Sequence, residues 1–365
     1  MKTVIFLILF LPFKSFGQDS YQWVLKPQYT WVSDFSEGLA VFYQDKKAGY
    51  INSSGEMVIQ PLYESAGIFM EGLASVKLNG KRGYINKKGD FVINPKFDET
   101  GNFLNGMARV KQDGNWGLIN TRGAILLPLQ YEKIENFSDE MALIKRDGKF
   151  GYINAAAKLV IQPQFMFAGD FSEGMAAVMV DDKTGFINKT GKMIIKPQFN
   201  SAYKFSDGLA LIIIGGKEEF DADQYGYINK KGELVIKPSF EEADYFSEGL
   251  APAKSDLFGY IDRSGEYVID QHFSKAGPFI GGLAIVKRIN SWGIIDKKGD
   301  FIVEPDYDYI EDFVNGITYV KKDSKYGFIN DKGMVLVAPV FDDAANFKEG
   351  LARVKMDGKW GFIKL

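Results

Sequence analysis

The sequence predicts an all-β protein built as a tandem array of about ten three-stranded meander units. A closed, propeller-like ring is favoured, and an open β-solenoid is the alternative. A glycine-centred motif, as in DGNWGLIN (113–120), recurs ten times along the 365 residues. Its spacing is nearly constant, which is the pattern of a repeat protein. Helical spacing of apolar residues is absent, whereas short apolar segments joined by Asp-Gly or Asn-Gly turns are typical of β-hairpins.

The N-terminal segment, residues 1–17, has the features of a secretory signal peptide. Lys2 supplies an early positive charge, an apolar stretch follows, and small residues stand at Ser15 and Gly17. The apolar stretch is too short to remain in a bilayer as a spanning helix. We expect cleavage after Gly17 and an extracytoplasmic protein, periplasmic or secreted, in which residues 18–365 form a single domain.

Composition excludes several classes of protein. The chain has no cysteine, so it cannot use disulfides or a lipid anchor attached to cysteine. It has 44 basic and 47 acidic residues, and this mild acidity argues against nucleic acid or an anionic membrane surface as a partner. A hydrophobic content of 46% is too high for a disordered chain. No later segment has the length of a membrane span.

The repeat unit has two invariant positions besides its marker glycine. The marker glycines are Gly49, Gly83, Gly117, Gly151, Gly185, Gly226, Gly259, Gly293, Gly327 and Gly361. Seven of their nine intervals are 34 residues, and the others are 41 and 33. An isoleucine stands two residues after every marker, and one phenylalanine, such as Phe103, recurs in each copy. We expect Ile119 and Phe103 to lie in the core between neighbouring sheets.

Each unit is expected to be an antiparallel meander. GMARV (106–110) and WGLIN (116–120) form a hairpin. In the preceding copy, a second turn at KKGD (87–90) leads to a third strand at FVI (91–93). The proline that follows, Pro95, is expected to end the strand because it has no N–H to donate. A lone sheet of this size is too small to be stable, so neighbouring copies must share a core.

The two ends of the chain favour the ring. The repeats begin with a third strand at WVLKP (23–27) and finish on a second strand at GFIKL (361–365), so the first segment could complete the last sheet. An open array needs polar capping units, and none is visible. Ten blades exceed the usual range of about four to eight, which keeps the solenoid as an alternative.

The repeated phrase resembles the WG repeat, also called the KWG repeat, of bacterial proteins. The Trp-Gly pair itself occurs at Trp116-Gly117, Trp292-Gly293 and Trp360-Gly361. Other copies have a different residue before the glycine, such as Phe150 or Arg82. The resemblance covers about residues 23–365. It implies an exported or surface-associated β-repeat protein, and the family has no shared catalytic residues to transfer.

Few residues have the pattern of an active site. His272 is the single histidine, and it stands at a position that varies between copies, which indicates an exposed turn. Glu37, Glu71 and Glu173 recur at one position of the unit. An active site is needed only once, so recurring acids indicate a scaffold or a distributed surface. We therefore expect no catalytic residues, no cofactor and no metal site.

The largest departure from the period is an insertion, GGKEEFDADQ (215–224), in what should be a tight hairpin turn. Three interpretations are open: a protruding contact loop, a weak calcium site of clustered carboxylates, and a tolerated surface insertion. The candidate binding residues are Glu218, Glu219, Phe220, Asp221 and Asp223.

The sequence favours an exported, non-enzymatic scaffold that binds a protein or an envelope glycan. One alternative is a hydrolase or lyase acting on polysaccharide, which would need a few carboxylates unique to one unit and converging on one cleft. Another is a structural spacer of the cell envelope. Aromatic residues could stack on sugars, but their recurrence indicates that most of them fill the core.

Overall fold

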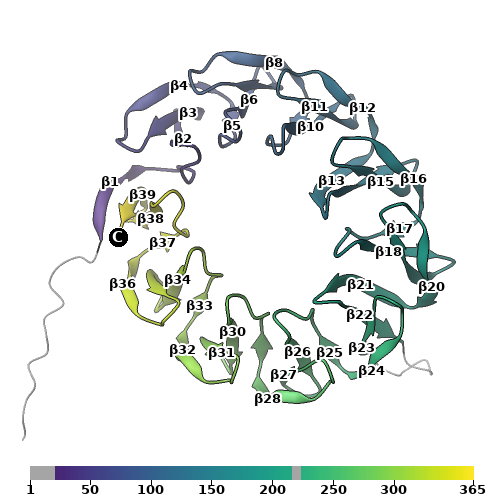
Figure 1. The fold of residues 1–365 in the computed structure, drawn as a ribbon. Helices are drawn as coiled ribbons and strands as arrows, with labels where there is room; N and C mark the ends of the chain where they lie inside the picture. The colour runs from purple at the N-terminus through teal and green to yellow at the C-terminus, as the bar shows by residue number, and fades with distance from the viewer. Residues whose placement is uncertain (1–20, 216–222) are drawn as a thin grey trace, which may run out of the picture.

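The computed structural model describes residues 21–215 and 223–365, and all regular secondary structure within them is β. Ten small antiparallel sheets are arranged around a ring, like the blades of a propeller (Figure 1). This confirms the predicted all-β ring of ten units and excludes the open solenoid. In the described ranges no helix is long and apolar enough to cross a membrane.

The innermost strand of each sheet is short, and it lies in the segment that the sequence indicated as a connection between copies. Nine of the ten described sheets have it, so they are four-stranded and not three-stranded. In the remaining sheet an isolated bridge between Val32 and Phe42 takes its place. The innermost strands are β5 (Ser65–Ala66), β9 (Glu99–Thr100), β13 (Lys133–Ser138), β17 (Phe167–Ala168), β21 (Ser201–Ser206), β25 (Glu242–Ala243), β29 (Lys275–Ala276), β33 (Tyr309–Ile310) and β37 (Asp343–Ala344).

The second and third strands form the predicted hairpin. The second strands are β2 (Leu39–Gln44), β6 (Ala74–Leu78), β10 (Met107–Gln112), β14 (Met141–Arg146), β18 (Met175–Val180), β22 (Leu209–Ile214), β26 (Ala251–Lys254), β30 (Leu283–Arg288), β34 (Ile317–Lys322) and β38 (Ala352–Met356). The third strands are β3 (Lys47–Asn52), β7 (Lys81–Ile85), β11 (Asn115–Asn120), β15 (Lys149–Asn154), β19 (Lys183–Asn188), β23 (Gln224–Asn229), β27 (Phe258–Ile261), β31 (Ser291–Asp296), β35 (Lys325–Asn330) and β39 (Lys359–Lys364).

The outer strand continues past the proline, so the prediction that proline ends it is wrong. Tyr84 pairs with Ile93 and Arg82 pairs with Phe97, so Pro95 lies in a bulge, where no N–H is needed for the ladder. The outer strands are β4 (Met57–Tyr63), β8 (Phe91–Phe97), β12 (Ile125–Tyr131), β16 (Leu159–Phe165), β20 (Met193–Phe199), β24 (Leu234–Phe240), β28 (Tyr267–Phe273), β32 (Phe301–Tyr307), β36 (Val335–Phe341) and β1 (Gln22–Tyr29).

The bulge explains why the marker residue is glycine. A Cβ added to Gly151 would lie 2.4 Å from the carbonyl oxygen of Ile161, on the neighbouring outer strand. At every marker glycine such an atom would lie within 3 Å of the backbone of that strand. No side chain fits in this space, so the glycine is required by the close approach of two backbones.

The chain closes the ring on itself. We number the blades along the chain: blade 1 holds β2, β3 and β4, blades 2 to 9 hold four strands each from β5 to β36, and blade 10 holds β37, β38, β39 and β1. In blade 10, Trp23 of β1 pairs with Ile363 of β39, and Tyr29 pairs with Trp360. The N-terminal strand therefore completes the last sheet, as the sequence predicted, and Figure 1 shows both strands side by side.

The invariant residues form the core between blades. All ten invariant isoleucines are at most 2% exposed. Phe103 and Ile119 are both fully buried, in one cluster with Tyr84 of the preceding blade. The rings of Tyr84 and Phe103 are 4.7 Å apart between centroids. The predicted burial of both residues is confirmed.

Candidate interaction surface

Successive hairpins of a blade lie at alternate ends of its sheet, because its strands are antiparallel. We call the connection between the innermost and second strands the inner hairpin, and the connection between the second and third strands the middle hairpin. The link from an outer strand to the next blade lies at the same end as the middle hairpins. The ring thus has an inner-hairpin face and a middle-hairpin face.

Carboxylates join neighbouring inner hairpins. The tip of the hairpin is a two-residue turn with both residues at positive φ, as at Glu37 (53°) and Gly38 (82°). The Glu37 carboxylate accepts a hydrogen bond of 3.0 Å from the N–H of Gly72 in the next blade. Glu349 of blade 10 binds Gly38 N–H in the same way at 3.0 Å, across the closure. In the described chain the carboxylates that make this contact are Glu37, Glu71, Asp139, Glu173, Asp207, Glu248 and Glu349.

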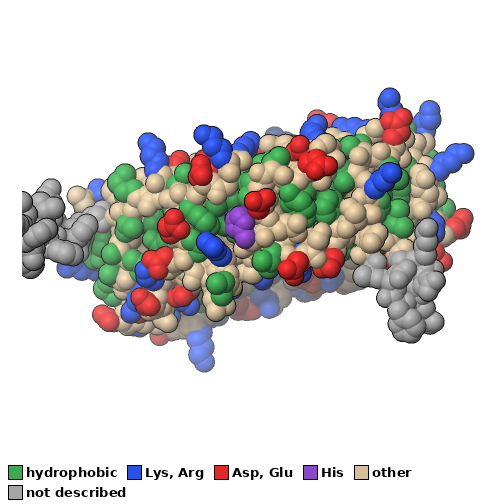
Figure 2. Space-filling model, turned by 90° about the horizontal axis from the view of Figure 1, so that it is seen from below, with side chains coloured by type: hydrophobic (Ala, Val, Ile, Leu, Met, Phe, Trp, Pro, Cys, Tyr) green, Lys and Arg blue, Asp and Glu red, His purple; other side chains and the backbone are tan. Residues whose placement is uncertain are grey.

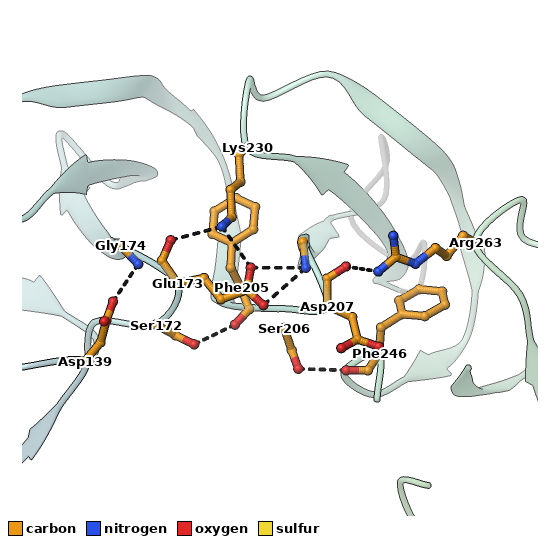
Figure 3. A network of polar contacts seen from close by, with 11 residues as sticks. Asp139, Ser172, Glu173, Gly174, Phe205, Ser206, Asp207, Lys230, Phe246 and Arg263 are labelled. Carbon is orange, nitrogen blue, oxygen red and sulfur yellow. Dashed lines mark hydrogen bonds and ion pairs between the residues drawn. The ribbon is translucent and has the colours of Figure 1, made fainter. Parts of the chain in front are cut away.

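Basic side chains from the next blade bind several of these turns. Lys230 lies 3.0 Å from Glu173 (Figure 3). Lys297 lies 2.9 Å from Glu248. The hydrogen bond from Lys297, followed by those from the Gly281 and Gly282 N–H groups, holds the pKa of Glu248 below its ordinary value despite partial burial. The recurring acids therefore link blades, which favours the scaffold over a distributed surface.

Two further links join blades from the same loop. The residue before the acid is often a serine, whose hydroxyl donates to the carbonyl of the invariant phenylalanine one blade on. Ser172 binds Phe205 O at 2.7 Å and Ser206 binds Phe246 O at 2.7 Å (Figure 3). The phenylalanine ring packs on an aromatic ring of the previous blade, as Phe205 does on Phe186 at 4.9 Å.

The interface between blades 8 and 9 departs from this pattern at all three links. Ile280 stands at the serine position, Gly281 at the acid position and Ile294 at the aromatic position. Ile280 is 59% exposed, and a small hollow of 60 Å³ lies between it and Phe313. This seam is thus held by fewer polar contacts than most others in the described ring.

Thr318 supplies a hydrogen bond that Ile294 cannot. In five other interfaces a tyrosine donates its hydroxyl to the backbone carbonyl 17 residues later, as Tyr260 does to Gly277 at 2.8 Å. The corresponding carbonyl after Ile294 belongs to Glu311, and Thr318 donates to it at 2.6 Å. Alanine stands at this position in the other nine copies. The single threonine therefore satisfies, from within blade 9, the carbonyl that a tyrosine of the preceding blade satisfies in five other interfaces.

On the middle-hairpin face, many blades carry an acid–lysine pair. In blade 2, Glu64 lies 3.7 Å from Lys77 and accepts a hydrogen bond from Gly80 N–H at 3.0 Å. In blade 4, Glu132 lies 3.6 Å from Lys145. Such exposed pairs contribute little free energy each, but they keep this face polar.

Blade 5 replaces the pair with apolar residues. Met166 stands at the position of Glu64 and is 70% exposed. Phe167 follows it and is 48% exposed, and Met179 stands at the position of Lys77. A hollow of 480 Å³ opens beside Met166 and Met179, and it is bordered by Asp181 and Asp182 at the hairpin tip. We call these five residues the blade-5 patch.

The insertion lies next to this patch. Ile214 pairs with Gln224, so the insertion connects β22 to β23, as predicted for a hairpin turn. Lys183 of blade 5 donates to the side chain of Asn200 at 3.0 Å, and Asn200 and Asp223 both lie beside Gly215 at the base of the insertion. Of the candidate binding residues, Asp223 is described, whereas Glu218, Glu219, Phe220 and Asp221 lie outside the described residues.

His272 lies on the outer edge of the ring, in β28, and is exposed (Figure 2, purple). Its ring contacts Phe273, with centroids 4.3 Å apart. The same edge carries hydrophobic side chains among the charged ones, since the second residue of most outer strands is aliphatic and exposed, as at Val92 and Val268. Within residues 21–215 and 223–365, no group of three or more His, Asp or Glu side chains could hold a metal ion.

The predicted binding residues did not include the blade-5 patch. The signal was present in the sequence, because Met166 and Met179 replace charged residues found at equivalent positions of other copies. Comparing only the spacing of the copies finds the insertion and misses such substitutions.

The family described as "WG containing repeat" matches ten segments of the chain: 22–47, 49–81, 83–116, 116–150, 150–183, 185–217, 225–256, 258–290, 292–326 and 326–360. The chain belongs to this family. The match confirms the resemblance inferred from the Trp-Gly motif, and its segments follow the blades around the whole ring. No curated protein matches the chain.

Several solved structures are similar to this WG-repeat protein in fold. The crystal structure of a eukaryotic initiation factor is 11% identical, with 77% of this chain and 88% of that chain covered and a TM-score of 0.50. BamB from Moraxella catarrhalis is 12% identical, with 85% and 92% covered and a TM-score of 0.31. PorZ of Porphyromonas gingivalis is 10% identical, with 92% and 57% covered and a TM-score of 0.27. At these identities the similarity concerns the fold alone.

Proposed function

We propose that this WG-repeat protein is an exported scaffold without enzymatic activity, and that it binds a protein partner through the middle-hairpin face of blades 5 and 6. The observation that supports this is the blade-5 patch. Six of the other nine blades have an acidic residue at the position of Met166 and the other three have a polar one, whereas blade 5 exposes Met166 and Phe167 to solvent. Contiguous apolar surface with a polar rim is typical of protein interaction sites.

The repeated residues support a scaffold role in another way. The recurring carboxylates bind backbone N–H groups and lysines of the next blade, so they hold the ring together. Most aromatic residues of the repeat pack between blades. The residues that remain for recognition are those that differ between copies.

Photo-crosslinking in native cells tests the proposed function. A benzophenone amino acid would replace Met166, and the matched control would carry it at Glu64, the equivalent position of blade 2. We expect protein adducts from position 166 and few from position 64. The absence of protein adducts at position 166, or identical adducts at both positions, would contradict it. Adducts that contain glycan alone would favour the envelope glycan as the partner.

Two further measurements test the remaining parts of the proposal. Mass spectrometry of the protein from native cells should find Gln18 as the first residue, and an intact Met1 would contradict export with cleavage. The purified protein should release no reducing ends from envelope polysaccharides. Their release would favour the polysaccharide-acting enzyme.

A further inference from the structure

We propose that the blade-5 patch binds an extended protein segment in which apolar residues are flanked by lysine or arginine. This rests on the proposed function and specifies the chemistry of the partner. The apolar residues of the segment would enter the hollow beside Met166 and Met179, and its basic residues would lie against Asp181 and Asp182.

The hollow has the size and lining for apolar side chains. Its 480 Å³ lies within the range of about 300–1,000 Å³ that is typical of ligand sites. Met166 and Met179 stand at its edge, with Phe165 and Val180 also in its lining. Methionine side chains are flexible and polarizable, so they adapt to different apolar partners. The hollow therefore suits a segment with bulky apolar residues.

The charges beside the hollow are negative. Asp181 and Asp182 are adjacent at the hairpin tip, both with positive φ, and in most other blades at least one of these two positions is uncharged. In the described chain neither carboxylate has a hydrogen-bond or ion-pair partner. Lys183, next to Asp182 in the chain, donates a hydrogen bond to the Asn200 side chain at 3.0 Å, and Asn200 and Asp223 both lie beside Gly215. Most other blades have a lysine close to this hairpin tip, such as Lys77 in blade 2, whereas blade 5 has Met179 at that position.

The apolar residues and the carboxylates of the blade-5 patch together favour one class of protein segment. An acidic segment would be repelled by Asp181 and Asp182, and a purely polar segment would leave the methionines without apolar contacts. A segment with apolar residues and a lysine or arginine nearby satisfies both parts of the patch. Opposite charges at the rim would also speed association, in a way that fades as salt rises.

A random 12-residue peptide library displayed on phage tests this inference on the purified protein. We expect the selected peptides to be enriched in Leu, Met, Phe or Trp next to Lys or Arg. Synthetic versions should bind at least tenfold more weakly to the variant Met166→Glu, Phe167→Ser, Met179→Lys, which gives blade 5 the residues of blade 2. An Asp181→Asn, Asp182→Asn variant should bind about threefold to tenfold more weakly and show less dependence on salt.

The control exchanges the charges of blade 2 by Glu64→Lys and Lys77→Glu, and it should bind the peptides as the unchanged protein does. Peptides that bind the blade-5 variant equally well, peptides rich in acidic residues, or no selected peptides at all would each overturn the inference. Protein crosslinks at position 166 together with any of these peptide results would leave the proposed function standing without this inference. The absence of protein crosslinks at position 166 would contradict the proposed function itself.

Discussion

Thr318 and Ile294 should be coupled energetically, because one replaces a hydrogen bond that the other position supplies in sister blades. The Thr318→Ala change removes the hydroxyl that donates to Glu311 O at 2.6 Å. Thr318 is fully buried, and alanine fits the same position in the other nine blades. The cost is therefore the unsatisfied carbonyl and not a packing defect. We expect about 1–2 kcal/mol of lost stability, since this hydrogen bond is partly buried.

Ile294→Tyr should reverse that loss. The tyrosine side chain at position 294 would extend toward the 60 Å³ hollow beside Phe313. Its hydroxyl would donate to the carbonyl of Glu311, as the Tyr260 hydroxyl donates to the carbonyl of Gly277. With Thr318 still present the two hydroxyls compete for one site, so the single Ile294→Tyr change should be neutral or destabilising by about 1–3 kcal/mol. The double variant should be at least as stable as the unchanged protein.

Urea unfolding of the four proteins, followed by tryptophan fluorescence and checked by calorimetry, measures the coupling. We expect a favourable interaction energy of at least about 1 kcal/mol between the two substitutions. Strictly additive effects would refute the assignment of Thr318 as a replacement for the missing tyrosine. Loss of stability in the double variant beyond either single one would refute it as well.

Three further predictions follow from the contacts within and between the blades. Ile119→Ala should cost about 2–5 kcal/mol in urea unfolding and Gln112→Ala no more than about 0.5 kcal/mol; equal midpoints would contradict the repeat register. Gly151→Ala should destabilise by about 1–3 kcal/mol, because its Cβ would meet the backbone of β16; an unchanged melting temperature would contradict the close approach. Stability should also fall with acid. The pKa values of Glu37 and Glu248 are lowered in the folded protein, so their contribution is present above the unfolded value of about 4 and is lost as pH falls through the folded values. A Glu37→Gln, Glu248→Gln variant should lose less stability between neutral pH and about pH 3, and an equal loss would contradict this.

The periodicity of the sequence was sufficient to predict ten β units, and the segments at the two ends favoured a ring closed through residues 23–27 over an open solenoid. The pairing of individual residues between neighbouring strands was predicted less well. The innermost strands have only two residues in most blades, which is too short for an alternating pattern to be visible. The bulge at Pro95 was missed because the absence of an N–H suggested an end to the strand, whereas the chain places the proline where the ladder is already interrupted.

The candidate site was also predicted only in part from the sequence. The insertion at 215–224 was found from the spacing, and its position at a hairpin tip was correct. The blade-5 patch requires a comparison of side chains at equivalent positions, and its exposure depends on which face the middle hairpins form. The role of Thr318 could not be predicted, because it depends on knowing which tyrosine hydroxyl reaches which carbonyl in the other blades.

The central claim is that the repeated residues stabilise the ring, whereas the blade-5 patch binds the partner. It is tested most directly by measuring the stability and the partner binding of one variant. Met166→Glu, Phe167→Ser, Met179→Lys gives blade 5 the residues of blade 2. Its melting temperature and its yield of co-purified partner from native cells would be compared with those of the unchanged protein. We expect an equal or higher melting temperature and at least a tenfold loss of partner. A retained partner, or a loss of partner accompanied by a fall in melting temperature, would contradict the assignment of recognition to this patch.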